Sequence, residues 1–316
     1  SFNTITGYKL KSNTLKGNYD IVTHSGMLTV TPVTKEITVT ITGNKLGTLY
    51  SGETQSVKGY RVAITGSTLY KESDFTFNGT AEASRLHAGE AYMDLDPEQF
   101  VNTNKNFTNV KFDVAEDGKL TIHRRLITMT SADAKKPYDS KPLIAHEVTV
   151  EGDGFVKDEG ATYAFTGTQT VVGKSENAFT YTRKSNTEKD DYVITKKYGT
   201  LEVTHRAEGQ EYEITVRANS GSKTYDGTAL KVEGFKTLSF TVNGQTYTVS
   251  GLTASAEGTN VSDSKAVTVT GTAIVRDAAN NDVTDQFAVT TKNGKLTINP
   301  VAIELTAASG SKPYDG

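Results

Sequence analysis

A tyrosine followed by an acidic residue recurs along the chain, and this pair is the arrangement best suited to chemistry. The segments Tyr138-Asp139-Ser140, Tyr225-Asp226-Gly227 and Tyr314-Asp315-Gly316 each place a phenol beside a carboxylate, which together could bind a polar ligand. The related segment Tyr50-Ser51-Gly52 keeps the tyrosine and lacks the aspartate.

The variation among the four copies favours a structural interpretation of this motif. A catalytic carboxylate would not be dispensable in one copy. A tight turn tolerates serine there, because Asp bonds to nearby backbone groups and Gly accepts positive φ. The residues of the predicted turn motif are Tyr50, Tyr138, Asp139, Tyr225, Asp226, Gly227, Tyr314, Asp315 and Gly316.

An acidic cluster at Asp277, Asp282 and Asp285 is the one place whose oxygen atoms could hold a calcium ion. The segment lacks the glycine at position six and the closing glutamate of an EF-hand loop. An acidic β-turn is therefore the favoured interpretation. We expect no cofactor, with calcium at these three aspartates as the alternative.

Histidines could also bind a bridging metal ion or make a joint between modules sensitive to pH. His123 and His205 are expected at equivalent ends of the Gly-x-Leu strand, and an arginine follows each of them. No second histidine or carboxylate lies at metal-ligand spacing, so polar residues at a strand end are favoured. The chain also has no Gly-x-Ser-x-Gly elbow, Walker loop or His-Glu-x-x-His motif. We predict no catalytic residues and no enzymatic activity.

Two interleaved markers show that these residues belong to a repeat. The four turn tyrosines at positions 50, 138, 225 and 314 are separated by 88, 87 and 89 residues. A Gly-x-Leu segment with alternating residues after it begins at Gly26, Gly118, Gly199 and Gly294. Such self-similarity is the signature of tandem modules.

Prolines mark the boundaries between the modules. Pro32 and Pro300 directly follow a Gly-x-Leu segment, where proline would end strand pairing. The predicted organisation is the C-terminal part of a preceding repeat (1–32), a divergent module (33–124), two further modules (125–206 and 207–300) and the start of a following repeat (301–316). Because no flexible linker separates them, we expect a stiff rod in which three modules extend on the order of 100 Å.

The local patterns predict β-structure. Residues 36–41 and 247–249 alternate with period two, and Asn243-Gly244 between two such runs predicts a hairpin. Only residues 98–101, after Pro97, suggest a helical turn. The fold class is therefore all-β, a tandem array of small β-sandwich-like modules, Ig-like or β-grasp-like, that forms an elongated rod.

The low content of hydrophobic residues is consistent with several small modules, each with a small hydrophobic core. The 316 residues contain no cysteine, which excludes disulfides and thiol catalysis, and only 35% hydrophobic residues. The net charge of −3, with basic and acidic residues interspersed, does not favour nucleic-acid binding. No apolar run is long enough to span a bilayer as a helix.

The motifs of the later modules resemble a known family. Residues 223–230, the segment Val283-Thr284-Asp285-Gln286-Phe287 and residues 294–300 are similar to the tandem YDG/MBG-type repeats of bacterial cell-surface adhesins of Gram-positive and gut species. The resemblance implies a non-enzymatic stalk or adhesive segment, extracellular and attached to the cell wall. Its partners would be neighbouring repeats and a host glycan, mucin or extracellular-matrix protein.

Two other functions stay open at this point. The divergent insert at residues 84–109 could bind glycan or mucin through Tyr92, Phe100 and Phe107, although covering a core is the favoured interpretation of these rings. The modules could also be accessory β-modules of a secreted carbohydrate-active enzyme.

Some Gram-positive stalk modules carry Lys–Asn isopeptide bonds, but the final strands here do not repeat a suitable asparagine, so we expect none.

Overall fold

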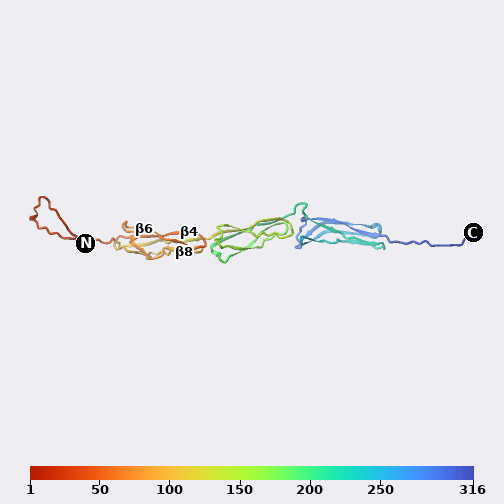
Figure 1. The fold of residues 1–316 in the computed structure, drawn as a ribbon, viewed down its shortest axis with the longest axis horizontal. Helices are drawn as coiled ribbons and strands as arrows, with labels where there is room; N and C mark the ends of the chain where they lie inside the picture. Colours follow the sequence, from red (N-terminus) through yellow and green to blue (C-terminus); the bar gives the residue numbers. More distant parts are fainter. The chain divides into compact units, whose positions relative to one another are not determined.

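The computed structural model describes residues 1–316 and shows an all-β, multi-module protein without α-helices (Figure 1). The chain divides into two compact units. Unit 1 comprises Ser1–Ile127, Gly152–Gly160 and Ser185–Val193, and unit 2 comprises Thr128–Glu151, Ala161–Lys184 and Ile194–Gly316. No helix is both long and apolar enough to cross a membrane.

Unit 1 is built from short strands and 3-10 turns. Its strands are β1 (Phe2–Asn3), β2 (Gly26–Met27), β3 (Ile37–Gly43), β4 (Lys45–Leu49), β5 (Gln55–Lys58), β6 (Tyr60–Thr65), β7 (Phe75–Phe77), β8 (Glu82–Arg85), β9 (Gly89–Tyr92), β10 (Phe100–Asn102), β11 (Val110–Glu116) and β12 (Lys119–His123). Its 3-10 turns are η1 (Lys16–Asn18), η2 (Glu72–Asp74), η3 (Pro97–Gln99) and η4 (Lys189–Asp191).

Unit 2 contains the remaining elements, and three strands belong partly to each unit. The shared strands are β13 (Arg125–Ser131), β15 (Val148–Gly152) and β19 (Tyr192–Lys197). The strands of unit 2 are β14 (Ala134–Pro137), β16 (Ala161–Phe165), β17 (Gly173–Glu176), β18 (Phe179–Arg183), β20 (Thr200–Thr204), β21 (Tyr212–Arg217), β22 (Gly221–Thr224), β23 (Leu230–Glu233), β24 (Ser239–Val242), β25 (Gln245–Gly258), β26 (Lys265–Val267), β27 (Val269–Arg276), β28 (Phe287–Lys292) and β29 (Gly294–Asn299). Its 3-10 turns are η5 (Val261–Asp263) and η6 (Thr284–Gln286).

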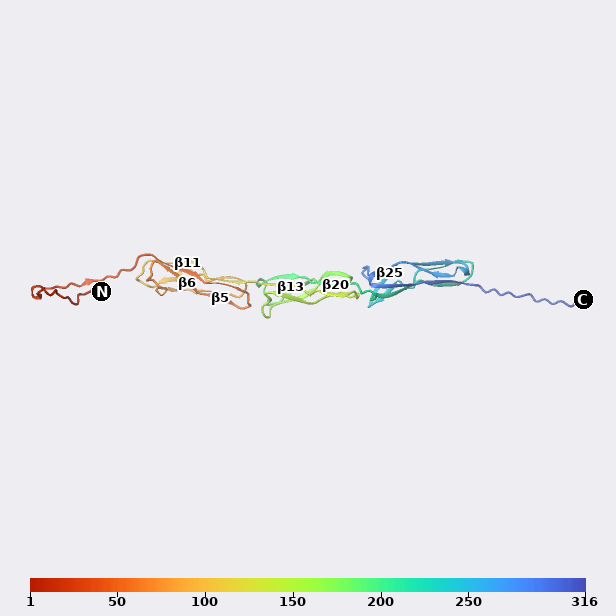
Figure 2. The ribbon, with the colours of Figure 1, turned by 90° about the horizontal axis from the view of Figure 1, so that it is seen from above.

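Two small sheets form the body of the module in unit 1. In one sheet β3 lies between β11 and β6, and in the other β12 lies between β4 and β9. Figure 2 labels β6 and β11 of the first sheet. The period-two pattern of β3 buries Ile37, Val39 and Ile41 and leaves the intervening threonines half-buried. Each large apolar side chain buried in this way contributes roughly 1.5–3 kcal/mol to folding.

The first and last strands of a module pair in parallel. In unit 1, β3 pairs with β11 and β4 pairs with β12, both in parallel. In unit 2 the same parallel pairing joins β14 to β20, β21 to β28 and β22 to β29. Alternating residues do not distinguish parallel from antiparallel partners, so the sequence left this topology open.

At Gly199 and Gly294 the glycine of the Gly-x-Leu marker lies where two backbones approach closely. A Cβ atom added to Gly294 would come within 1.8 Å of the Asn219 carbonyl oxygen, and one on Gly199 would come within 2.4 Å of the Ser131 carbonyl oxygen. At Gly118 the added atom would lie 2.1 Å from the sulfur of Met93. Only glycine fits beside the backbone at Gly199 and Gly294, whereas at Gly26 the nearest atom to an added Cβ, Asn3 Cβ, is 3.9 Å away.

Several local predictions are confirmed. Asn243 and Gly244 adopt positive φ values of 51° and 80° and connect β24 to β25, as the predicted hairpin requires. The helical turn predicted over 98–101 is confirmed only in part, because the 3-10 turn η3 covers Pro97–Gln99 while Phe100 and Val101 belong to β10. Strand β29 ends at Asn299, immediately before Pro300.

Candidate functional site: two joints built on the repeated tyrosine

The Tyr-Asp-Gly motif forms a turn with one recurring backbone feature. Its third position has positive φ in every copy: 80° at Gly52, 65° at Ser140, 80° at Gly227 and 79° at Gly316. Ser140 takes a conformation that normally favours glycine. The position therefore demands a backbone conformation rather than a particular side chain.

The aspartate of the motif is used inside the turn. Asp226 Oδ1 lies 2.7 Å from Lys223 Nζ and accepts hydrogen bonds from the Thr228 amide at 2.9 Å and its hydroxyl at 2.8 Å. The bond from Lys223, followed by those from Thr228, holds the pKa of Asp226 well below its ordinary value.

The second copy of the motif repeats this arrangement. Asp139 Oδ1 lies 2.7 Å from Lys136 Nζ and accepts the Lys141 amide at 3.0 Å. Burial acts to raise the pKa of Asp139, but the hydrogen bonds from Lys136 and the Lys141 amide, together with the charges of both lysines, outweigh it, and the pKa lies below its ordinary value. Both carboxylates thus fix the backbone of a turn.

The tyrosines of the four copies differ sharply in exposure. Tyr50 is 4% exposed and Tyr138 is 1% exposed, whereas Tyr225 is 40% and Tyr314 is 95% exposed. Residues from beyond the end of the predicted module cover the first two. We call the cluster around Tyr50 in unit 1 the first joint and the cluster around Tyr138 in unit 2 the second joint.

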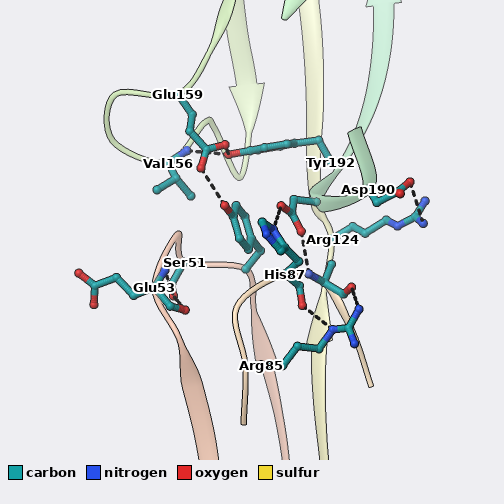
Figure 3. Close-up of polar contacts among 12 residues, drawn as sticks. Ser51, Glu53, Arg85, His87, Arg124, Val156, Glu159, Asp190 and Tyr192 are labelled. Atoms are coloured by element: carbon teal, nitrogen blue, oxygen red, sulfur yellow. Dashed lines mark hydrogen bonds and ion pairs between the residues drawn. The ribbon is translucent and has the colours of Figure 1, made fainter. Parts of the chain in front are cut away.

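In the first joint, a carboxylate joins two phenols (Figure 3). Tyr50 donates to Glu159 Oε1 at 2.8 Å, and Tyr192 donates to Glu159 Oε2 at 2.7 Å. Burial, and then the bond to Glu159, raise the pKa of Tyr50. Burial also raises the pKa of Tyr192, against the opposing hydrogen bond from the Val156 amide. Both phenols therefore stay protonated at neutral pH and serve as donors.

A second contact of the first joint buries a carboxylate completely. Asp191 is 0% exposed, and its oxygens accept from His87 Nδ1 at 2.8 Å and from the Ala88 amide at 2.7 Å. Both partners come from the loop between β8 and β9, while Asp191 ends η4. The His87 ring also stacks on Tyr50, with ring centroids 6.2 Å apart. The buried carboxylate is thus satisfied entirely by the preceding module.

Arg125 connects the chain leaving β12 to the same cluster. Its Nη1 donates to the Tyr50 carbonyl at 2.9 Å and its Nε donates to the Gly154 carbonyl at 2.8 Å. Gly52 lies close by, since a Cβ there would meet Val156 Cγ1 at 2.6 Å. A guanidinium with several rigidly placed donors suits this role of holding separate carbonyls.

The second joint uses neutral groups around its tyrosine. The hydroxyls of Tyr138 and Tyr247 lie 3.1 Å apart, and the ring of Tyr247 packs on Phe287 with centroids 4.7 Å apart. Burial, followed by the hydrogen bond to Tyr247, raises the pKa of Tyr138. Tyr138 and Val203 share one core cluster with Tyr247 and Phe287, so apolar packing continues through this joint.

An arginine and a buried amide complete the second joint. Arg206 donates through Nη1 to the Tyr138 carbonyl at 2.9 Å and to the Tyr212 hydroxyl at 3.1 Å. The Gln286 side chain accepts from the Arg206 amide at 3.0 Å, and its Nε2 lies 2.9 Å from His205 Nδ1. Gln286 ends η6 directly before Phe287, just as Asp191 ends η4 directly before Tyr192.

The structure corrects the expected equivalence of His123 and His205. The Tyr50 amide donates to the carbonyl of His123, whereas the Tyr138 amide donates to that of Thr204. His205 therefore corresponds to Arg124, and Arg206 corresponds to Arg125. Counting from the marker glycines reveals this offset, because His123 is the fifth residue after Gly118 and His205 is the sixth after Gly199.

The three residues suggested for ligand binding lie in different environments. Phe100 is buried with Phe75, Phe77, Phe112 and Tyr60, and Phe107 is buried against Tyr70. This burial removes both phenylalanines from the side chains that a ligand could contact in this conformation. Tyr92 is 48% exposed, with Lys119 Nζ 5.6 Å from its ring centroid.

The three aspartates considered for calcium lie in turns, and two of them accept internal hydrogen bonds. Asp277 accepts the amides of Ala279 and Asn281, and Asp282 accepts the Thr284 amide and hydroxyl. Asp285 is an exposed residue of η6. No three His, Cys, Asp or Glu side chains of the chain come close enough together to hold a metal ion.

The comparisons with known proteins add little to this geometry. No family model matches the chain, and no curated protein matches it. Among solved structures, it is similar to the crystal structure of the I9–I11 tandem from titin, with 12% identity, 83% of this chain and 100% of that chain covered, and a TM-score of 0.22. At that score the similarity carries no argument about function.

Proposed function

We propose that this chain is a non-enzymatic structural segment of a bacterial surface protein. It acts outside the cell as a stalk that projects a binding domain from the surface or contributes to host or matrix adhesion. One observation carries the proposal: the repeated tyrosine is buried at two successive joints, at Tyr50 and at Tyr138, by residues of the following repeat. When the end of one repeat is buried by the next, the contacts fix the orientation of the two repeats, and a stalk requires such fixed orientations.

The polar side chains singled out above also support a structural role. Glu159 and Asp191 accept hydrogen bonds within the first joint, and Asp226 holds the turn around Lys223. Groups that are occupied in this way stabilise the fold. The resemblance to YDG/MBG-type adhesin repeats points to the same role.

Small-angle scattering of residues 1–316 tests the stalk. We expect an extended profile, and a compact, sphere-like profile would overturn the proposal. A double variant, Tyr50→Ala with Tyr138→Ala, should broaden the distribution of interatomic distances, because both joints lose their central ring. Tyr225→Ala, at an exposed copy of the same tyrosine, is the matched control and should leave the profile unchanged.

A second candidate function, glycan or mucin binding by the divergent insert, is favoured by the exposure of Tyr92. Its ring lies beside Lys119, and its hydroxyl donates to Glu90 at 2.8 Å. Exposed aromatic rings flanked by charges can bind sugars. Binding to a glycan array that Tyr92→Ala abolishes and Tyr198→Ala, at another exposed tyrosine, preserves would support this function. If no glycan on the array bound, the glycan-binding function would be excluded and the stalk function would be unaffected.

A further inference from the structure

We propose that each module is built to resist tension along the chain, because its first and last strands form a parallel pair that a pull on the two ends loads in shear. This inference rests on the proposed stalk and adds to it a mechanical activity that projection alone does not need.

The path of the chain through residues 207–300 shows the geometry most completely. The chain enters at Tyr212, runs through β21 and β22, and leaves through β28 and β29 at Asn299. Tyr212 pairs with Phe287 and Arg217 with Lys292 in the first ladder. Because the two runs are parallel, the entry and exit points lie at opposite ends of the paired strands.

Force on these two points must slide one run of strands past the other. The register joins six residue pairs between β21 and β28 and four between β22 and β29. In such sliding, all the ladder hydrogen bonds carry load together. An antiparallel pair pulled from one end would instead open one bond after another.

The ladder continues through the point where the strands change sheets. The Ala218 amide, between β21 and β22, donates to the Lys292 carbonyl at 2.9 Å. In unit 1 the Lys119 amide donates to the Asn44 carbonyl at 3.0 Å at the corresponding place. The two sheets of a module therefore share the load as one continuous seam.

The Tyr-Asp-Gly turn closes the far end of this seam. The Tyr225 amide donates to the Asn299 carbonyl at 2.8 Å, the Tyr138 amide to that of Thr204 at 2.9 Å and the Tyr50 amide to that of His123 at 2.9 Å. At two of these ends the arginine that follows, Arg125 or Arg206, binds the carbonyl of the same tyrosine. The motif thus secures the exit strand at the point where tension arrives.

The same arrangement is present in the other predicted modules. Residues 33–124 have six parallel pairs between β3 and β11 and five between β4 and β12. Residues 125–206 have four between β14 and β20. Shear loading is therefore a property of the repeat and not of one copy.

Single-molecule pulling with two handle positions tests the inference on the whole chain. Since the protein has no cysteine, paired substitutions give unique attachment points. Handles at Gln210→Cys and Asn299→Cys load the seam in shear. Handles at Gln210→Cys and Asp285→Cys pull the same module from one end, so that β21 peels away from β28.

We expect the shear geometry to require a several-fold higher unfolding force than the peeling geometry at the same loading rate, because forced unfolding follows the unfolding barrier. The released length, roughly 3.3–3.6 Å per residue, identifies the module that unfolds. Equal forces, or a higher force in the peeling geometry, would overturn the inference. Since scattering tests the stalk separately, an extended chain with low shear resistance would retain the stalk and discard load bearing.

Discussion

The two joints place the same tyrosine and the same arginine in opposite electrostatic settings. In the first joint, Tyr50 donates to Glu159, and His87, which stacks on Tyr50, contacts Asp191. In the second, Tyr138 and Arg206 meet Tyr247 and Gln286, which are uncharged. The repeat therefore keeps the tyrosine and the arginine of a joint and lets the residues that contact them vary.

The histidines make the contrast sharper, because they stand in opposite hydrogen-bonding roles. A carboxylate can only accept when ionised, so His87 Nδ1 donates to Asp191. The Gln286 Nε2 group can only donate, so His205 Nδ1 accepts. The two imidazoles therefore take different hydrogen-bonding roles in the two joints.

The largest expected effect comes from truncating the central ring of each joint. Tyr138→Ala should lower the local free energy of opening by about 3–5 kcal/mol, as for other large-to-small changes in a core. Tyr50→Ala should do the same in the first joint and also leave Glu159 without one donor. Hydrogen exchange of the amides at positions 138 and 50 measures both effects.

Tyr225→Ala is the internal control for that experiment. Tyr225 is 40% exposed, far more than Tyr50 or Tyr138, so its truncation should change exchange at position 225 by less than about 1 kcal/mol. A loss at position 225 as large as at position 138 would show that the ring stabilises its own turn and not the joint.

Alkaline pH should weaken both joints, and the direction follows from the phenols. The pKa values of Tyr50 and Tyr138 are raised above the ordinary value of 10.0, mainly by burial. Below that pH the folded and unfolded chains are equally protonated, so the contribution to stability is complete. Above it the unfolded chain loses protons first, and the contribution falls as the pH rises through the folded pKa values.

Tyrosinate absorbance follows this titration. Comparison with Tyr50→Phe, Tyr138→Phe and Tyr225→Phe assigns the individual rings. We expect the difference spectra of the first two variants to show late ionisation. If Tyr50 or Tyr138 ionised together with the bulk of the tyrosines, the burial and hydrogen bonding assigned to that ring would be wrong.

The alternating strands, the hairpin at Asn243-Gly244 and the need for turns at the tyrosines were predictable from sequence, because each depends on residues close together in the chain. The buried leucines of the Gly-x-Leu marker, Leu120, Leu201 and Leu296, follow the same local pattern. Parallel pairing of first and last strands was not predictable, since it depends on contacts between residues more than 65 positions apart.

The acceptor residues of the joints were also missed, although one signal was present. Glu159 lies in a loop that has no counterpart marker, and nothing local connects it with Tyr50, 109 residues away. Asp191 and Gln286 are different, because each directly precedes an aromatic residue that begins a strand, Tyr192 or Phe287. Alignment of the repeats on those aromatics would have paired the two acceptors.

Truncating the acceptor that precedes the aromatic residue, Asp191 in the first joint and Gln286 in the second, should have a larger effect in the first joint. Asp191→Ala should reduce protection of the Ala88 amide by about 1.5–3 kcal/mol, because a bond to a charged group is lost. Gln286→Ala should reduce protection of the Arg206 amide by only about 0.5–1.5 kcal/mol. Hydrogen exchange at these two amides measures the difference directly.

Asp190, next to Asp191 in the sequence, is the control for the loss of one negative charge without the loss of a buried contact. Asp190 pairs with Arg124 at 3.8 Å in an exposed position, so Asp190→Ala should cost less than about 1 kcal/mol. Equal losses from Asp190→Ala and Asp191→Ala would mean that net charge, and not the buried contact, distinguishes the joints. Equal losses from Asp191→Ala and Gln286→Ala would remove the distinction between the joints.

The smallest expected effect concerns the turn that supports the second joint. Ser140 holds a φ of 65° at the position where Gly52 and Gly227 hold 80°. Ser140→Gly should therefore stabilise this turn by up to about 1 kcal/mol, since a left-handed conformation is unfavourable for a residue with a Cβ. Exchange of the Tyr138 amide should slow, whereas Gly227→Ala should accelerate exchange of the Tyr225 amide by a similar amount. No change in the first variant would mean that the Ser140 hydroxyl, through its bond to the Asp139 carbonyl, already offsets the backbone strain, so that the two joints rest on equally stable turns and differ in their acceptors alone.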